Sequence, residues 1–330
     1  MAKGRILTGD RPTGSLHLGH YVGSLANRVK LQDEYDTFII IADVQGLTTN
    51  FEHPEKLREN VFQVAKDYLA VGIDPEKSTI FIQSLVPQIA ELTVFYSMLV
   101  TVNVLRHNPT IKTEAKQYGY SDMTYGFLGY PVSQAADITF CKANVVPVGI
   151  DQVPHIEFAR KIVRRFNELY KPVLVEPTAL VGEVGRLVGI DGEAKMSKSL
   201  GNCIYLSDSA EEVSKKISMA VTDPARQRRT DPGHPEVCTV YAYHKAFNPE
   251  FVPELTGACK AAEIGCVDCK KRLAVAINNL LEPMRERRAI YEARPDLVND
   301  ILKAGTKRAC EEGEKTMSEV RKAMCLDYFD

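Results

Sequence analysis

Short apolar runs alternate with amphipathic stretches along the first half of this chain. Four runs have the length of β-strands, at Arg5–Thr8, Asp36–Asp43, Thr79–Ile82 and Val145–Val148. Continuous apolar runs of this kind are typical of strands buried on both faces of a sheet. Apolar residues recur at helical spacing over residues 18–31, 54–72, 87–99, 130–141 and 153–169. This alternation predicts an α/β fold with a doubly wound parallel sheet.

The rest of the chain is rich in helix formers and predicts an α-helical region. Its first helix should follow Ser209, because Ser209 and Glu212 have the spacing of a capping box. We expect an α/β domain over residues 1–204 and a helical domain over residues 205–330, whose final helices can pack back on the first domain. Basic clusters in the helical region are candidate contacts for nucleic-acid phosphates. They lie at residues 226–229, 270–272 and 285–288.

The stretch from Arg11 to Leu25 is the first candidate functional segment. It joins the first predicted strand to a helix through a turn rich in Gly, Pro and Ser. Backbone N–H groups at such a helix N-terminus form a natural anion site. His17 and His20 fall on one face of the first helical turn, and Gly19 leaves room for a flat ligand against the backbone. A surface turn with two solvated histidines is the alternative for this segment taken alone.

A second candidate segment is Lys195-Met196-Ser197-Lys198-Ser199. Two lysines and two serines lie between Gly192 and Gly201, which is typical of a mobile loop that binds a polyanion. A charged surface loop is again the alternative. The two segments stand about 180 residues apart.

Together the segments resemble the two signatures of class I aminoacyl-tRNA synthetases. His17-Leu18-Gly19-His20 is similar to "HIGH", and residues 195–199 match "KMSKS" letter for letter. Tyr130–Ile138 and Val146–Glu157 also resemble, in order and spacing, bacterial tryptophanyl-tRNA synthetases. The resemblance covers nearly the whole chain and implies a Rossmann-like catalytic domain followed by a helical domain that binds the tRNA anticodon.

The resemblance also implies an activity and its residues. Such an enzyme activates L-tryptophan with ATP and Mg²⁺ and transfers it to tRNA(Trp), as a homodimer. His17, His20, Lys195 and Lys198 would be catalytic. The tryptophan site would contain Gln45, Gln134, Asp137 and Gln152. The ATP site would contain Arg11, Pro12, Thr13, Gly19, His20, Lys112, Gly149, Ile150, Asp151, Leu187, Lys195, Met196, Ser197, Lys198 and Ser199.

Asp137 is the residue that would choose the substrate. It lies on a polar stripe of the predicted helix 130–141, opposite an apolar side, so the carboxylate is expected to line a pocket with a partner. An indole N–H only donates and a carboxylate only accepts, so the two fit. The chain departs from the family pattern at three positions near the substrates. Arg11 replaces a glutamine, Gln45 a histidine and Ile150 an acidic residue.

Four of the eight cysteines form a further pattern. Cys238, Cys259, Cys266 and Cys269 have the spacing C-x₂₀-C-x₆-C-x₂-C. Four thiolates suit Zn²⁺ or an iron–sulfur cluster. The resemblance to a subset of tryptophanyl-tRNA synthetases with a C-terminal four-cysteine motif favours a [4Fe–4S] cluster, with Zn²⁺ or free thiols as alternatives.

Composition narrows the class of protein. The chain has 330 residues, 45% of them hydrophobic and 25% charged, and a net charge of −2, so RNA contacts would need local basic patches. It has no signal-peptide pattern and no apolar stretch near the ~20 residues of a membrane span. We expect a cytoplasmic protein with no membrane or DNA partner. Tyrosyl-tRNA synthetase, a metabolite nucleotidyltransferase and a non-catalytic paralogue that binds tryptophan or RNA are the alternatives.

Overall fold

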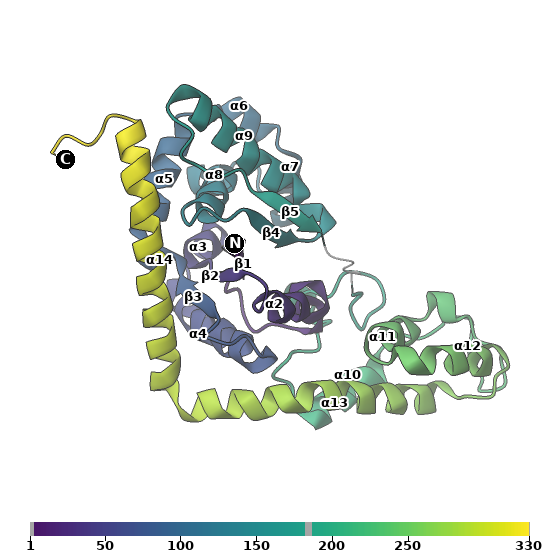
Figure 1. Cartoon of the computed structure of the whole chain (residues 1–330). Helices are drawn as coiled ribbons and strands as arrows, with labels where there is room; N and C mark the ends of the chain where they lie inside the picture. The colour runs from purple at the N-terminus through teal and green to yellow at the C-terminus, as the bar shows by residue number, and fades with distance from the viewer. Residues whose placement is uncertain (1–2, 182–186, 330) are drawn as a thin grey trace.

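The computed structural model describes residues 3–181 and 187–329, and within them a single parallel sheet forms the centre (Figure 1). Its strands follow the order β3-β2-β1-β4-β5, and every neighbouring pair is parallel. The doubly wound parallel fold predicted from the apolar runs is confirmed. The fifth strand was not predicted. The strands are β1 Arg5–Asp10, β2 Asp36–Ile41, β3 Ser78–Ile82, β4 Val145–Val148 and β5 Thr178–Val181.

The inner strand β2 shows why its sequence is apolar throughout. Phe38 and Ile40 pack into one buried core, while Ile39 and Ile41 pack into a second. Alternate side chains of a strand point to opposite faces, so a sheet covered on both sides needs apolar residues at every position. Helices cover both faces of β2, so neither face of the strand is exposed to solvent or needs polar residues.

Up to residue 181 of the described chain, nine α-helices and a π-helical turn connect and cover the strands. Two boundary signals are confirmed in α4, where Pro54 occupies the first turn and Gly72 ends the helix in a left-handed conformation. The helix expected over residues 18–31 is present, with a π-helical turn between α1 and α2. The elements are α1 Leu18–His20, the π turn Tyr21–Leu25, α2 Ala26–Leu31, α3 Asp43–Asn50, α4 Pro54–Val71, α5 Pro87–Ser97, α6 Val102–Arg106, α7 Pro109–Tyr118, α8 Tyr125–Thr139 and α9 Val153–Leu169, with 3₁₀ turns at Gln83–Leu85 and Ile150–Gln152.

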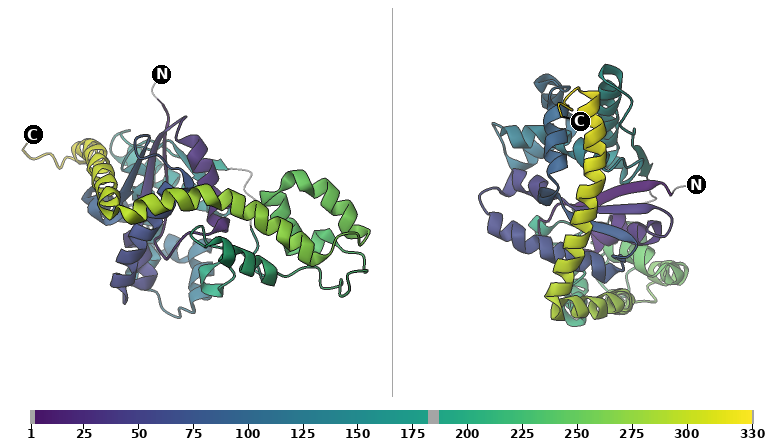
Figure 2. Two further views of the ribbon diagram at one scale, coloured as in Figure 1. Left: turned by 90° about the horizontal axis from the view of Figure 1, so that it is seen from below. Right: turned by 60° about the vertical axis from the view of Figure 1, so that its left-hand side comes forward.

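Helices dominate the rest of the described chain. Ser209 caps α10 as predicted: its hydroxyl accepts the Glu212 N–H at 3.2 Å, and the Glu212 carboxylate accepts the Ser209 N–H at 2.8 Å. Helices α11 and α12 form a lobe beside the first half of α13, apart from the sheet, and α13 leads back toward it (Figures 1 and 2). The helices are α10 Ala210–Met219, α11 Thr239–Phe247, α12 Val252–Lys260, α13 Cys266–Ala293 and α14 Pro295–Ala323, with 3₁₀ turns at Lys198–Leu200, Pro235–Val237 and Pro249–Phe251.

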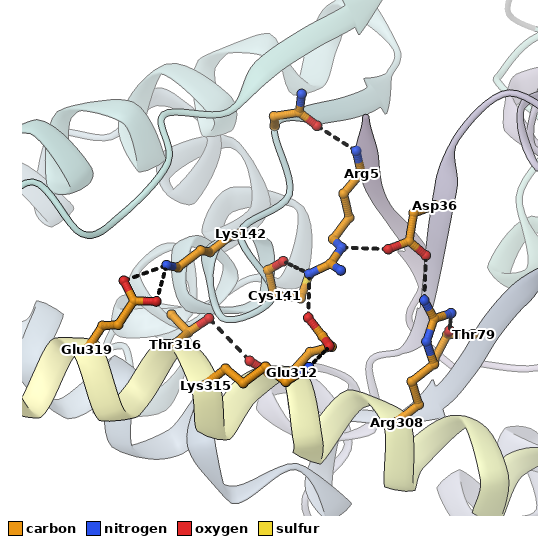
Figure 3. Close-up of polar contacts among 11 residues, drawn as sticks. Arg5, Asp36, Thr79, Cys141, Lys142, Arg308, Glu312, Lys315, Thr316 and Glu319 are labelled. Atoms are coloured by element: carbon orange, nitrogen blue, oxygen red, sulfur yellow. Dashed lines mark hydrogen bonds and ion pairs between the residues drawn. The ribbon is translucent and has the colours of Figure 1, made fainter. Parts of the chain in front are cut away.

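The last helix, α14, packs against the sheet and not against the lobe. Arg308 donates to Asp36 at 2.7 Å, and Arg5 donates to Asp36 at 2.8 Å and to Glu312 at 2.9 Å (Figure 3). Lys142 and Glu319 form a further ion pair at 2.7 Å. A domain boundary at residue 204 remains a proposal. Although α14 follows that boundary in the sequence, it packs on the sheet of the first domain.

None of the helices in residues 3–181 and 187–329 combines the length and apolar character needed to cross a membrane.

Candidate active site

The two signature loops touch each other at the carboxyl end of the sheet. The Lys198 ammonium donates to the Gly14 carbonyl at 2.6 Å, and the Gly19 N–H lies 3.3 Å from the Met196 sulfur. Gly14 has φ +121°, a conformation that only glycine adopts without strain. Segments about 180 residues apart in the sequence thus form one surface.

Backbone hydrogen bonds hold this arrangement from the other side. The Leu18 N–H donates to the Ile204 carbonyl at 2.9 Å, and the Leu206 N–H donates to the Leu16 carbonyl at 3.0 Å. The chain that leaves the second signature therefore runs beside His17. These contacts fix the positions of the two signature segments relative to each other.

The two histidines stack at the start of α1. Their ring centroids are 3.9 Å apart, and the His20 Nδ1 accepts the backbone N–H of His17 at 3.2 Å. Burial and the neighbouring cationic groups lower the pKa of His17 to about 3, and burial lowers the pKa of His20 to about 4. Both rings are neutral at pH 7, so they can donate hydrogen bonds to phosphate oxygens but contribute no full charge.

A buried polar network that the sequence analysis missed supports the histidines. Arg28 donates to Asp10 at 2.6 Å, and the Tyr68 hydroxyl donates to the same carboxylate at 2.8 Å. Burial opposes the charge of Asp10, but Arg28 outweighs burial and lowers the pKa of Asp10. Asp10, a charged residue at the end of the first strand, could have indicated this network in the sequence.

The residues of the second signature have different environments. Lys195 is exposed, whereas burial lowers the pKa of Lys198 against the opposing effect of Asp10 and Asp67. Met196 is buried and donates its N–H to the Leu187 carbonyl at 3.1 Å. The Ser197 N–H donates to Asn202 at 2.8 Å, which fixes the turn. The side chain of Ser199 lies outside the described residues.

A second set of polar residues surrounds Asp137 on α8. Gln83 donates its amide to the Asp137 carboxylate at 2.7 Å and accepts the Gln45 N–H at 3.1 Å. Burial raises the pKa of Asp137 to about 7, since the single Gln83 hydrogen bond offsets little of the desolvation. Gln83 was missed, although a polar residue directly after the third strand run is a usable signal.

The expected two-sided pattern of α8 is only partly correct. Asp137 is buried at 3% exposure, as expected for a residue with a partner, while Gln134 is half-buried. Cys141, also on the predicted polar stripe, packs in the apolar core. Helix α8 is enclosed on most sides because α5, α9 and α3 all pack against it.

The remaining candidate residues border this edge of the sheet. Arg11 lies 3.9 Å from Glu114 on α7, Pro12 is buried and Thr13 exposed. Lys112, on α7, is exposed. Gly149 follows β4, which pairs with β1, and accepts the N–H of Gln152 at 2.9 Å. Ile150 is 71% exposed, and the Asp151 side chain lies outside the described residues.

Sequence comparison places this geometry in a family. Residues 2–282 match the family described as tRNA synthetases class I (W and Y). A tryptophan–tRNA ligase of Clostridium longisporum is 51% identical over 100% of this chain and 99% of its own length. That of Thermotoga maritima is 49% identical over 98% of this chain and 100% of its own.

The chain belongs to the tryptophan–tRNA ligase family.

Solved structures agree with this assignment. The tryptophanyl-tRNA synthetase of Campylobacter jejuni, complexed with ADP and tryptophan, superposes with a TM-score of 0.87 at 32% identity and covers 97% of this chain and 99% of its own. A tyrosyl-tRNA synthetase of Archaeoglobus fulgidus, at 23% identity and a TM-score of 0.68, covers 87% of this chain and 90% of its own, and shares the fold alone. The fold and the tryptophan–tRNA ligase class inferred from the sequence are confirmed.

The four cysteines of this ligase converge in the lobe but are not arranged as metal ligands. Among the described residues, no group of three or more His, Cys, Asp or Glu side chains could hold a metal ion. Cys269 contacts His244 at 3.5 Å, and Arg226 donates to Cys259 at 3.8 Å. Burial, followed by the charges of the other three cysteines, raises the pKa of Cys269 to about 12. The four thiols are therefore neighbours, but their contacts in the described residues are not those of metal ligands.

One of the three basic clusters does not match its expected role. In residues 285–288, Arg285 donates to the Asp208 carbonyl at 3.2 Å and Arg287 to the Ala70 carbonyl at 2.6 Å. Arg288 pairs with buried Asp67. Arg287 and Arg288 attach α13 to α4, and Arg285 binds the chain just before α10, so these arginines are not free for phosphate. Arg228, Arg229 and Lys271 of the other clusters are exposed.

Proposed function

We propose that this tryptophan–tRNA ligase activates L-tryptophan with ATP at the two touching signature loops and transfers it to tRNA(Trp). The observation that carries the assignment of the site is the contact between Lys198 and Gly14, because it brings a cationic side chain onto the helix N-terminus of the histidines. Full-length similarity to tryptophan–tRNA ligases supports the substrate.

In the first step, a tryptophan carboxylate oxygen attacks the α-phosphorus of ATP, and the bond to pyrophosphate breaks. No protein nucleophile is needed, so positioning and electrostatics supply the catalysis. The neutral rings of His17 and His20 donate to α-phosphate oxygens. Lys195 and Lys198 neutralise charge that develops on the leaving pyrophosphate. Mg²⁺, when bound with ATP, shares the charge of the β- and γ-phosphates.

Asp137 recognises the indole N–H in this proposal. Among the residues that the structure describes, the buried carboxylate has one donor, Gln83, and a carboxylate can accept several hydrogen bonds. The indole N–H supplies a second donor. An analogue without that N–H leaves the carboxylate underpaired, which costs affinity. Gln45, Gln134 and Gln152 would complete the tryptophan site.

In the second step, the terminal ribose hydroxyl of the tRNA attacks the carbonyl carbon of the adenylate, and AMP leaves. The exposed basic residues Arg228, Arg229 and Lys271 of the lobe would contact tRNA phosphates. This places the acceptor end of the tRNA at the sheet and another part at the lobe.

Amino-acid-dependent ATP–pyrophosphate exchange tests the substrate. The purified protein is assayed with each standard amino acid and with no amino acid. Exchange that depends on tryptophan, with far lower rates for tyrosine and phenylalanine, is the expected result. Exchange that depends on another amino acid, or none, would refute the proposal.

We also propose that Cys238, Cys259, Cys266 and Cys269 take up a [4Fe–4S] cluster, with Zn²⁺ as the alternative. The support is the donor chemistry: four cysteines gather from the ends of α11, α12 and α13. Four thiolates match either group. Present contacts of Cys259 with Arg226 and of Cys269 with His244 would have to open. The centre would order the lobe and would have no part in activation.

Metal analysis of protein purified without oxygen tests this site. A cluster predicts broad absorbance near ~400 nm and about four irons per chain. Cys269→Ser should lose the iron and weaken tRNA charging, while ATP–pyrophosphate exchange is retained. Cys325→Ser, at an exposed cysteine outside the group, is the matched control. One zinc per chain would select the alternative, and protein without metal would refute both.

We propose, last, that the ligase is a homodimer through α5 and α6. Val94 and Met98 stand one turn apart at the end of α5, Val102 begins α6, and the three side chains are 54%, 67% and 54% exposed. Val104 adds a fourth exposed apolar side chain, at 50%. A group of exposed apolar side chains of this kind is typical of a protein–protein interface.

A further inference from the structure

Helix α13 reaches the first signature through a buried ion pair. The Arg288 guanidinium lies 2.5 Å from the Asp67 carboxylate, and the two side chains are 9% and 1% exposed. Asp67 stands on α4, and its second oxygen accepts the backbone N–H of Leu16 at 2.7 Å. Leu16 directly precedes His17. Arg288 is 221 positions from Asp67 in the sequence, so only the fold makes this connection.

The surroundings of the pair leave it little freedom. Arg288 also donates to Gln63 at 2.6 Å and to Glu292 at 2.7 Å, so its guanidinium is held at three points. A planar guanidinium with several partners fixes orientation as well as charge. Burial of Asp67 raises its pKa to about 6, against the lowering effect of Arg288 and the Leu16 N–H, and leaves the carboxylate ionised at neutral pH.

The backbone around His17 is thereby fixed from two sides. The Leu16 carbonyl accepts the Leu206 N–H from the chain after the second signature, while the Leu16 N–H is bound by Asp67. Losing the Asp67 contact would leave a buried N–H without its acceptor and free the loop to move. Displacement of a catalytic group by about 1 Å can cost about 10²-fold in rate.

We propose that Arg288 and Asp67 are positioning residues for tryptophan activation: Arg288 orients the Asp67 carboxylate, and Asp67 holds Leu16 so that His17 meets the α-phosphate. The inference rests on the proposed role of His17. It gives the helical C-terminal region a part in the activation step, besides binding tRNA, because the arginine comes from α13. Neither residue touches a substrate in this scheme.

Arg287 provides a matched control. It stands next to Arg288 and also fastens α13 to α4, through the Ala70 carbonyl at 2.6 Å, but it makes no hydrogen bond to Asp67 or to the signature loop among the described contacts. Replacing either arginine weakens the attachment of α13. Only Arg288→Gln should disturb His17.

The test is ATP–pyrophosphate exchange with thermal unfolding measured in parallel. Arg288→Gln should lower kcat about 10–100-fold and leave KM for tryptophan within about twofold, since the indole site is untouched. Arg287→Gln should keep kcat within about threefold. Equal losses in the two variants would mean that α13 attachment alone matters, and would overturn the inference.

A double variant keeps the test decisive if Arg288→Gln fails to fold with an unpaired buried carboxylate. Asp67→Ala with Arg288→Gln leaves no unpaired buried charge and removes the acceptor of the Leu16 N–H. A folded double variant with kcat lowered at least about tenfold supports the positioning role, and wild-type kcat overturns it. Wild-type protein without tryptophan-dependent exchange would instead refute the proposed function, so the two failures are distinguishable.

Discussion

At the scale of single residues, burial decides what each functional group can do. His17 and His20 are neutral donors because burial lowers their pKa values, so the full positive charge must come from the lysines. Lys198 is positioned for this by its bond to the Gly14 carbonyl, which places the ammonium beside the helix N-terminus before ATP binds.

Lys198→Ala should therefore lower the rate of adenylate formation about 10²–10³-fold, the scale of removing one preorganised contact to a transition state. Tryptophan binding measured by calorimetry should change little, because the lysine acts on phosphate and not on the indole. A variant with near-normal exchange would remove Lys198 from the mechanism.

The pKa of Asp137 predicts how tryptophan recognition depends on pH. The carboxylate is the form that accepts the indole N–H, and burial raises its pKa to about 7. KM for tryptophan should rise by up to about tenfold per pH unit below that value and level off above it. Exchange kinetics from pH 5.5 to 8.5 measure this. In Asp137→Asn the slope should vanish, and a slope that persists would assign it to another group.

Asp137 affects the stability of the fold with the opposite pH dependence, since folding favours its protonated form. Its folded pKa lies above the unfolded value of ~3.9, so its contribution to stability is present at low pH and is lost as pH rises toward about 7. Asp137→Asn should remove this loss, so the variant should gain stability over wild type at pH 8 and not at pH 4. Urea unfolding at the two pH values checks the sign.

At the scale of elements, the docking of α14 on β3 depends on one glycine. A Cβ at Gly305 would lie 2.0 Å from the backbone carbonyl oxygen of Ile80, so no side chain fits without moving the helix. The Arg5–Glu312 and Arg308–Asp36 ion pairs also hold α14 on the sheet, and Arg5 pairs with the same Asp36 (Figure 3). The close approach lets these short contacts form.

Gly305→Ala should destabilise the protein by at least about 2 kcal/mol, because the added methyl meets backbone and not a flexible side chain. Gly257→Ala in α12 is the control, since a Cβ there meets nothing within 4 Å. It should stabilise by up to about 1 kcal/mol through helix propensity. Urea denaturation of both variants gives the comparison, and similar effects would show that α14 adjusts freely.

At the scale of the whole molecule, α13 and α14 join parts that the chain order separates. The lobe of α11 and α12 lies at one end of α13 (Figure 1). Near the other end, Arg288 pairs with Asp67, which binds the backbone of the first signature at Leu16. The sheet is thus enclosed by the N-terminal helices on one side and by the last helix on another (Figure 2). The exposed apolar side chains of α5 and α6 are not covered by either set of helices.

The homodimer proposal predicts a change of mass when that face becomes charged. Met98→Glu with Val102→Glu should convert a dimer into a monomer, because burying two carboxylates without partners costs more than the face contributes. Sedimentation equilibrium measures this, with Val275→Glu, at a 60% exposed residue of α13, as the control. A wild-type monomer would end the proposal.

The sequence by itself determined the features that depend on near neighbours. Apolar runs specified four of the strands, Pro54 and Gly72 bounded α4, and Ser209 capped α10. The residues that carry these signals lie within one turn or one strand of each other, so the signals can be read from the sequence without knowing the fold. The two signatures are local in the same sense, which is why the family was evident from them.

Only the tertiary structure decided which distant residues become partners. Gln83 reached Asp137 across 54 positions and Arg288 reached Asp67 across 221, and nothing in either segment names the other. The cluster at 285–288 has the composition of a phosphate-binding site. In the fold its Arg288 instead pairs with the buried Asp67 carboxylate, and this ion pair compensates for the loss of hydration of the arginine. Local pattern specifies an element and its chemistry, while the partner of each buried charge is chosen when the elements pack.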